Sequence, residues 1–304
     1  MPAAPWRKSS SAAAPTFPEL GGWELAGEIG EGTWAKVFAA RRSSEGDGCC
    51  DYALKTLNTA CATDLSFQQG RAMLQREALV GRQLSHPHLA PVLDWQLKNQ
   101  PFLVMPRIEG RTLRVLLDHR RREFGCLIGA AKFLPQSVWA VRQVATALSA
   151  LHAAGWLHGD VKPENVLVDS QGHATLIDLG LARQLGTREC RGGEVLAGTL
   201  AYVAPESFLP AATLSAESDV YSLGAMLYEL LTGQPLFAES NPTQLALRHL
   251  REAPADVREA ALDVPPQLAR LVMRMLAKEP LRRPAAVEVA KQLSRLEIEL
   301  MGAV

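Results

Sequence analysis

The hydrophobic pattern of the chain changes its period near Gly110. Before that point, "WELAGEIGEGTWAKVFAARR" (23–42) and "CDYALKTL" (50–57) alternate apolar and polar residues, which is typical of half-buried strands. A helical pattern from Gln68 to Leu84 and two more strand-like runs, 90–97 and 101–108, complete this part. Farther along, the period becomes 3.6 residues. The clearest stripe comprises Val138, Val141, Val144, Ala145, Leu148 and Leu151. The sequence therefore predicts an α+β protein with a small sheet lobe, one helix in that lobe, and a larger helical lobe.

The boundaries of these parts follow from composition. Residues 1–20 are rich in Ala, Pro and Ser and predict a disordered lead. We expect one domain over 21–298, with the small lobe at about 21–105, a connector at 106–110, the helical lobe at about 111–298, and a short tail at 299–304. The mouth between two lobes is a natural place for a ligand.

Composition excludes several classes of protein. Lys+Arg and Asp+Glu are both 32 in 304 residues, so the charge predicts no general attraction to nucleic acid or to an anionic membrane. No apolar run approaches the roughly 20 residues that span a bilayer, and the N-terminus lacks the apolar core of a secretory signal, so we expect a cytoplasmic protein. The cysteines form no CxxC pair and predict free thiols in a reducing compartment. They are Cys49, Cys50, Cys61, Cys126 and Cys190.

The stretch "HGDVKPENVLV" (158–168) places Asp160, Lys162 and Asn165 directly before an apolar run. Turn formation alone would account for much of such a cluster, because Pro, Asn and Asp favour turns. The following residues, "VLVDSQGHATLID", read as a hairpin with its turn at 169–172, which would fold Asp178 back beside Asn165. One basic and three oxygen-bearing side chains around one point suit a hydroxyl that loses a proton and a phosphate with its metal ions.

A second group of residues lies in the sheet lobe. In "GEGTWAKV", Gly30 and Gly32 lie at a strand turn, where the missing side chains let backbone amides approach a polyphosphate. An ordinary hairpin would give the same pair. The next strand carries Lys55 in "YALK", and the following helix carries Glu77, which would fix the charge of a cleft-facing lysine.

From about Trp23 to Leu296, the chain resembles the eukaryotic-type (Hanks-type) Ser/Thr protein kinases of bacteria. The motifs that carry the resemblance occur in the family's order. They are "GEGTWAKV", "YALK", "QREAL", "HGDVKPEN", "DLG", "GTLAYVAPE", "DVYSLG" and "KEPLRRP". The resemblance implies a bilobal kinase fold with an antiparallel sheet in the small lobe, ATP and Mg²⁺ as ligands, and Ser/Thr hydroxyls of proteins as acceptors.

The resemblance also assigns catalytic roles. Asp160 would accept the proton of the substrate hydroxyl, and Lys162 would neutralise the transferred phosphoryl group. Asn165 and Asp178 would hold the magnesium ions.

For the nucleotide, the resemblance implies that Lys55, paired with Glu77, holds the α- and β-phosphates of ATP. Met105 matches the back of the adenine pocket, and the connector 106–108 matches the segment whose backbone bonds adenine. The nucleotide-binding residues implied in this way are Gly30, Gly32, Trp34, Val37, Ala53, Lys55, Met105, Pro106, Ile108 and Leu167.

Further matches are structural. Thr199 would brace Asp160 and Lys162, and "GTLAY" together with the lysine of "DVKPEN" points to Ser/Thr acceptors rather than Tyr. Glu206 and Arg283 match a buried pair, and Asp219 matches an acid at a helix start that supports the catalytic loop.

The sequence departs from the family pattern at a few positions. The catalytic loop reads HGD where HRD is usual, so Gly159 cannot contact a phosphate on the activation segment. Leu179 replaces the usual Phe of DFG and is still apolar, and Ala35 replaces the third glycine of the loop. The apolar stretch 123–135 is an extra segment that we expect to pack against its own lobe. Thr187 is a candidate autophosphorylation site, with Arg188 and Arg191 beside it.

Two rival functions remain at this point. HGD also occurs in aminoglycoside-type small-molecule phosphotransferases, but these lack the peptide-receiving segment "GTLAYVAPE". A pseudokinase that serves as a nucleotide-binding scaffold usually lacks the lysine, the catalytic aspartate or the metal-binding acid. All of these are present as Lys55, Asp160 and Asp178.

Gly159 in HGD leads to a prediction about regulation. Because Gly159 offers no cation to a phosphorylated activation segment, we expect activity that does not depend on phosphorylation of that segment. Treating the purified protein with a phosphatase should leave its transfer activity unchanged, and loss of activity would refute this expectation.

Overall fold

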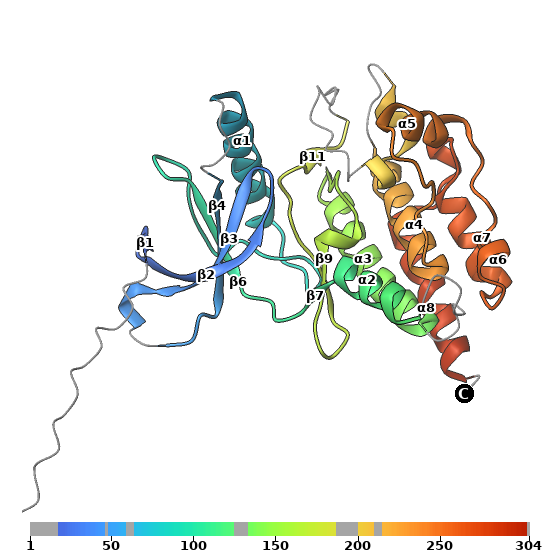
Figure 1. Ribbon diagram of the computed structural model, residues 1–304, viewed down its shortest axis with the longest axis horizontal. Helices are drawn as coiled ribbons and strands as arrows, with labels where there is room; N and C mark the ends of the chain where they lie inside the picture. The colour runs from blue at the N-terminus through green and yellow to red at the C-terminus, as the bar shows by residue number, and fades with distance from the viewer. Residues whose placement is uncertain are drawn as a thin grey trace, which may run out of the picture.

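The computed structural model describes residues 18–45, 48–58, 64–124, 133–186, 200–209 and 215–302. Figure 1 shows a twisted sheet with helix α1 at one side of the molecule and a larger group of helices at the other. The α+β class and the two-lobed arrangement predicted from the change of period are therefore confirmed.

The small lobe is built on a six-stranded antiparallel sheet in the order β1-β2-β3-β4-β6-β5. Successive side chains point to opposite faces of the sheet, and both faces carry buried residues. Leu54 and Val104 belong to one apolar cluster, and Leu57 and Leu103 belong to another. The strands are β1 (Glu19–Leu20), β2 (Trp23–Glu31), β3 (Ala35–Arg42), β4 (Tyr52–Leu57), β5 (Asp94–Gln96) and β6 (Phe102–Pro106).

Helix α1 (Asp64–Gly81) packs on this sheet through an apolar stripe. Leu74 and Ala78 are buried and join Leu57 and Leu103 in one cluster, because residues four apart lie on the same helix face. The helix begins and ends earlier than the expected span of Gln68 to Leu84. Gly81 lies so close to Val92 that a Cβ there would be 2.6 Å from Val92 Cγ2.

The predicted hairpin after the catalytic stretch is confirmed. Strands β9 (Val166–Val168) and β10 (Ala174–Leu176) pair antiparallel, and Asp169 closes the turn by accepting hydrogen bonds from the backbone N–H groups of Gln171 and His173. Strand β7 (Arg111–Thr112) adds to β9, and β8 (Trp156–Leu157) pairs with β11 (Arg183–Gln184).

The large lobe consists mainly of helices around one apolar core. The α-helices are α2 (Leu113–Phe124), α3 (Leu134–Ala153), α4 (Ala216–Thr232), α5 (Pro242–Arg251), α6 (Val257–Ala260), α7 (Pro266–Met275) and α8 (Ala286–Gly302). The single-turn 3-10 helices are η3 (Pro163–Asn165), η4 (Leu200–Tyr202), η5 (Pro205–Phe208) and η6 (Pro280–Arg282), with η1 (Ser43–Glu45) in the sheet lobe.

Helix α3 forms the centre of this core. The stripe predicted from Val138 to Leu151 is fully buried and packs against α4 and α8. Complete burial of such a side chain contributes about 1.5 to 3 kcal/mol. The chain leaves the helix at Gly155, whose φ of 83° suits a residue without a Cβ.

A second contact, besides the connector, joins the two lobes. The N–H of Leu176 on β10 donates to His88 O at 2.9 Å, and the N–H of Ala90 donates to Leu176 O at 3.0 Å. These bonds tie the segment after α1 to the hairpin that precedes Asp178. Both lobes therefore help to fix the position of Asp178.

Elements lie close to both expected boundaries. Glu19 and Leu20, the last residues of the segment 1–20, form strand β1 against Trp23 and Glu24. Helix α8 continues to Gly302, through most of the expected tail. Residues 125–132 of the extra apolar stretch, and residues 1–17, lie outside the described residues.

The predicted buried pair of Glu206 and Arg283 links η5 to the segment before α8. Arg283 has a fully buried side chain and donates to both carboxylate oxygens of Glu206, each at 2.7 Å. It also donates to the carbonyl oxygens of Glu217, Ala277 and Lys278. Burial opposes ionisation of Glu206, but hydrogen bonds and charge from Arg283 hold its pKa below the usual value.

This pair makes a prediction for stability. Arg283→Met leaves the Glu206 carboxylate buried without its cation, so the free energy of unfolding should fall by about 3 to 5 kcal/mol in chemical denaturation. Arg282→Met is the matched control, because Arg282 and its partner Glu279 are both exposed and such pairs contribute at most about 1 kcal/mol. Equal losses in the two variants would contradict this interpretation of the pair.

Candidate active site

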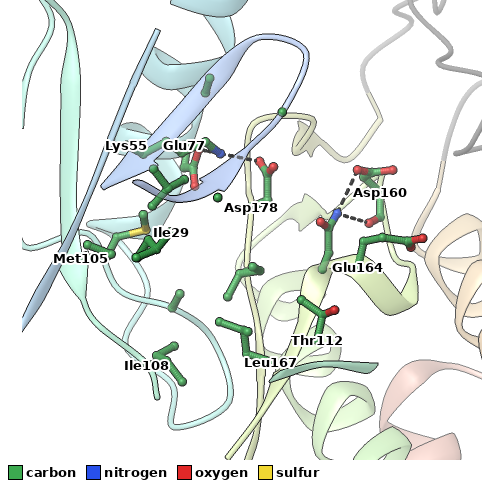
Figure 2. A pocket seen from close by; sticks show the side chains of 18 of the residues that line it. Ile29, Lys55, Glu77, Met105, Ile108, Thr112, Asp160, Glu164, Leu167 and Asp178 are labelled. Atoms are coloured by element: carbon green, nitrogen blue, oxygen red, sulfur yellow. Dashed lines mark hydrogen bonds and ion pairs between the residues drawn. The ribbon is translucent and has the colours of Figure 1, made fainter. Parts of the chain in front are cut away.

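A cleft with a volume of about 860 Å³ lies between the two lobes. Figure 2 shows side chains from the sheet lobe, such as Lys55 and Met105, facing Leu167 and Asp160 of the helical lobe across it. All the site residues predicted from the sequence line this cavity. They are Gly30, Gly32, Trp34, Val37, Ala53, Lys55, Glu77, Met105, Pro106, Ile108, Asp160, Lys162, Asn165, Leu167 and Asp178.

Lys55 is at the centre of the upper part of the cleft. It lies on β4, between Val37 of β3 and Leu103 of β6 in the sheet register. Its Nζ is 2.7 Å from Glu77 Oε2 and 2.9 Å from Asp178 Oδ1. Two carboxylates, one from a helix and one from a loop, thus meet the ammonium of a strand residue (Figure 2).

The electrostatics of this triad follow from its burial. Burial alone would lower the pKa of Lys55, but the charges of Asp178 and Glu77 raise it above its usual value, so the lysine stays charged. Burial raises the pKa of Glu77 to about 7 against the opposing effect of Lys55. Burial also opposes ionisation of Asp178, yet Lys55 lowers its pKa to about 2. Asp178 is therefore an anion under all ordinary conditions.

Asp178 has an unusual backbone conformation. Its φ is 67°, a region that costs a non-glycine residue of the order of 1 to 3 kcal/mol. The N–H of Gly180 donates to Asp178 Oδ1 at 3.1 Å, and Arg76 of α1 donates to Gly180 O at 3.2 Å. The next residue, Leu179, which stands where Phe is usual, is buried in the core of the large lobe.

The catalytic loop forms the floor of the cleft. Asp160 Oδ2 is 2.7 Å from Lys162 Nζ and accepts a hydrogen bond from Asn165 Nδ2 at 2.9 Å. The same amide nitrogen donates to Asp160 O at 2.8 Å, so the amide orientation of Asn165 is fixed. The other carboxylate oxygen, Asp160 Oδ1, is buried and has no hydrogen-bond partner in the part of the chain that the structure describes.

Asp219, at the start of α4, holds the catalytic loop from below. Its carboxylate accepts hydrogen bonds from the backbone N–H groups of His158 at 2.7 Å and Gly159 at 2.8 Å, and it pairs with His152 Nε2 at 2.8 Å. Burial opposes its ionisation, but the hydrogen bond from His152 and its charge help to hold the pKa of Asp219 below the usual value. This is the support that the sequence predicted for Asp219.

Gly159 occupies a position that favours glycine. Its φ is 77°, and a Cβ there would lie 2.6 Å from Leu181 O, closer than real Cβ atoms approach. The usual arginine would therefore be strained in this loop. The residues Thr187, Arg188, Arg191 and Thr199 lie outside the described residues.

Sequence reasoning missed an ionic cluster beside the catalytic loop. Arg114 of α2 donates to Glu164 Oε1 at 2.8 Å, to Glu229 Oε1 at 3.0 Å and to the hydroxyl of Tyr202. Arg121 also pairs with Glu229 at 2.7 Å, and the carboxylate of Glu229 is almost fully buried. The cluster joins η3 to η4 and α4. Glu164 lies within "KPEN" and Tyr202 within "GTLAYVAPE", but no motif marks the arginines or Glu229.

The residues present suit a magnesium ion. Asp178 supplies a carboxylate, and the fixed amide nitrogen of Asn165 leaves its amide oxygen as a hard donor. Among the described residues, no group of three or more His, Cys, Asp or Glu side chains is arranged to hold a metal. Mg²⁺ typically takes one or two protein oxygens and completes its shell with water and substrate phosphates.

Comparison with known proteins shows the family. The protein kinase domain family matches residues 23–293, and the chain belongs to it. It is 34% identical over 294 residues to a probable serine/threonine-protein kinase of Corynebacterium efficiens, covering 92% of this chain and 42% of that protein. It is 34% identical over 270 residues to another of Streptomyces coelicolor, covering 86% of this chain and 38% of the relative. Serine/threonine-protein kinase PknD of Mycobacterium tuberculosis is 33% identical over 267 residues, with 87% and 38% covered.

The predicted Ser/Thr protein kinase class is thereby confirmed for this domain. The chain spans about two fifths of the length of these relatives. Within the described ranges, none of the helices has the length and apolar character needed to cross a membrane.

The raised pKa of Glu77 predicts a pH dependence. As the pH falls through about 7, Glu77 takes up a proton and stops neutralising Lys55, so kcat/KM for ATP should fall on the acid side of that value. Glu77→Gln should be less active and should lack this acid limb. The phosphates of ATP titrate in the same way with the unmodified chain and with Glu77→Gln. The difference between the two pH profiles therefore reports the titration of Glu77. Superimposable pH profiles would contradict the prediction.

Proposed function

We propose that the cleft transfers the γ-phosphoryl group of ATP, bound with Mg²⁺, to a serine or threonine hydroxyl of a protein. The observation that carries this proposal is the Lys55 ammonium, held 2.7 Å from Glu77 and 2.9 Å from Asp178 in the cavity that also contains the catalytic loop. Phosphoryl transfer depends mainly on positioning and on electrostatic stabilisation, and this arrangement supplies fixed charges for both.

Asp160 acts on the acceptor. Lys162 and Asn165 occupy its Oδ2, which leaves the buried Oδ1 to accept a hydrogen bond from the substrate hydroxyl. In the transfer step the hydroxyl oxygen forms a bond to the γ-phosphorus, the bond from that phosphorus to the β,γ-bridging oxygen breaks, and ADP keeps the bonding pair. The hydroxyl proton passes to Asp160.

Two lysines carry the positive charge of the site. Lys55 holds the α- and β-phosphates, and its carboxylate partners keep it charged inside the cleft. Lys162, 2.7 Å from Asp160, faces the place where charge develops on the transferred group. Asp178 and Asn165 would hold Mg²⁺, which when bound neutralises phosphate charge and orients the phosphates.

The adenine ring would occupy the apolar inner end of the cleft. Val37 and Ala53 of the sheet lobe close it from one side and Leu167 from the other, with Met105 at the back. The connector is held to the sheet because the N–H of Arg107 donates to Asp51 O at 2.8 Å. Burial of the flat ring between apolar side chains then supplies the part of the nucleotide affinity that does not depend on the phosphates.

For the whole protein, we propose that the acceptors are hydroxyl groups of other proteins. Its relatives' names support protein hydroxyls as acceptors over small molecules. The complete set of Lys55, Asp160, Asn165 and Asp178 supports an active enzyme over a pseudokinase scaffold. We propose a cytoplasmic kinase domain that neither binds nucleic acid nor inserts into membranes.

We propose two further features of its regulation. The catalytic loop offers glycine where a phosphate-binding arginine is usual, and the φ of 77° at Gly159 supports activity without phosphorylation of the activation segment. Thr187 is proposed as an autophosphorylation site, with Arg188 and Arg191 beside it in the sequence.

Removing Lys162 tests the proposed chemistry. Lys162→Ala deletes a preorganised positive charge, so kcat should fall on the order of 10²- to 10³-fold while KM for ATP changes less. Transfer from radiolabelled ATP to a generic basic protein measures this rate, and Asp160→Asn is the control that should give only background. Lower ATP affinity with unchanged kcat in Lys162→Ala would contradict the role. Equal activity of the unmodified chain and Asp160→Asn would contradict the enzyme proposal itself.

A further inference from the structure

Asn58, directly after strand β4, binds the tip of the glycine loop. Its backbone N–H donates to Trp34 O at 3.0 Å, and its side-chain amide donates to Gly32 O at 3.3 Å and to Glu31 Oε1 at 3.4 Å. Asn58 is only 8% exposed. These bonds hold the loop on both sides of Thr33, in addition to the turn bond from Gly32 N–H to Ala35 O at 2.8 Å.

Helix α1 meets the same loop at Gly70. A Cβ at Gly70 would lie 2.9 Å from Leu57 Cδ2, 3.3 Å from Trp34 O and 3.6 Å from Trp34 Cβ. The first of these distances is shorter than real Cβ atoms show, and the second is tight. The absence of a side chain at Gly70 therefore lets the loop tip lie directly on the helix.

The cleft face of α1 contacts a different part of the site at each turn. Gly70 meets Trp34, and Glu77, seven residues later on the same face, binds Lys55. Between them, Met73 packs against Gly180, where a Cβ would be 3.3 Å from Met73 Cβ. One helix thus contacts the glycine loop, the Lys55 ammonium and the segment that carries Asp178.

We propose that Asn58 and Gly70 form a loop seat, a pair of positioning residues that sets the height of the glycine loop above the phosphates of ATP. The inference rests on the proposed nucleotide-binding role of that loop. Because the loop is bound to α1 and to β4, closure over the phosphates and the inward position of Glu77 stabilise each other. Asn58 does not line the cleft, and Gly70 lines it without a side chain, so both would act through the loop.

The seat predicts a difference between a nucleotide, ATP, and its nucleoside, adenosine. Asn58→Asp keeps the size of the side chain and the backbone N–H, but its carboxylate cannot donate to Gly32 O and repels Glu31. ATP, which uses the phosphate loop, should bind roughly tenfold more weakly, the factor that corresponds to about 1.4 kcal/mol. Adenosine, which has no phosphates, should bind with unchanged affinity. Isothermal titration of the unmodified chain and the variant with each compound measures both.

Gly70→Ala provides a second and independent variant. Alanine is the better helix former, so a loss of ATP affinity with adenosine affinity unchanged would not be due to a weaker helix. Gln75→Ala, on the exposed face of α1, is the matched control and should leave both affinities unchanged. Thermal unfolding midpoints verify that all variants are folded.

The outcomes separate the seat from a general structural role. Selective loss for ATP in both seat variants supports the proposal. Equal weakening of ATP and adenosine, or no weakening of ATP, overturns it while leaving the proposed kinase function intact. Failure of the unmodified chain to bind ATP would overturn the proposed function and the seat together.

Discussion

The charge of Lys55 is the interaction on which the rest of the site depends. A buried ammonium is costly unless anions compensate it, and here the anions come from two segments that are remote in sequence, Glu77 of α1 and Asp178 after the hairpin. The sheet, the helix and the hairpin must therefore be correctly placed at the same time for the lysine to be stable. The same condition assembles this end of the cleft, because Lys55 would meet the phosphates of a nucleotide and Asp178 would meet its metal.

The helical lobe supplies a second fixed centre. Asp219 at the start of α4 orients the backbone of the catalytic loop, and Asn165 and Lys162 orient Asp160 from within that loop. The two centres are joined by the short hairpin, since Ile177 N–H donates to Asn165 O at 2.9 Å, next to Asp178. Phosphoryl transfer depends on positioned groups and fixed charges. The helical lobe would supply the proton acceptor, and Lys55 of the sheet lobe would supply charge for the phosphates.

Much of this arrangement was predictable because its signals are short in range. The buried stripe on α3 follows from a 3.6-residue period, and the hairpin that returns Asp178 to Asn165 follows from a turn between two apolar runs. The remaining features depend on tertiary placement. Arg114 and Glu229 are 115 positions apart, and no local pattern marks either one. The seat at Asn58 and Gly70, and the positive φ of Gly159, likewise become visible only when neighbouring segments are in place.

A crystal structure with Mg²⁺ and a non-hydrolysable ATP analogue tests the central claim most directly. We expect a cation bound by the Asp178 carboxylate and the Asn165 amide oxygen at about 2.0 to 2.1 Å. Lys55 should contact the α- and β-phosphates while keeping Glu77 as its partner. Oxygens of Asp178 and Asn165 directed away from any cation, or an analogue bound outside the cleft, would contradict it.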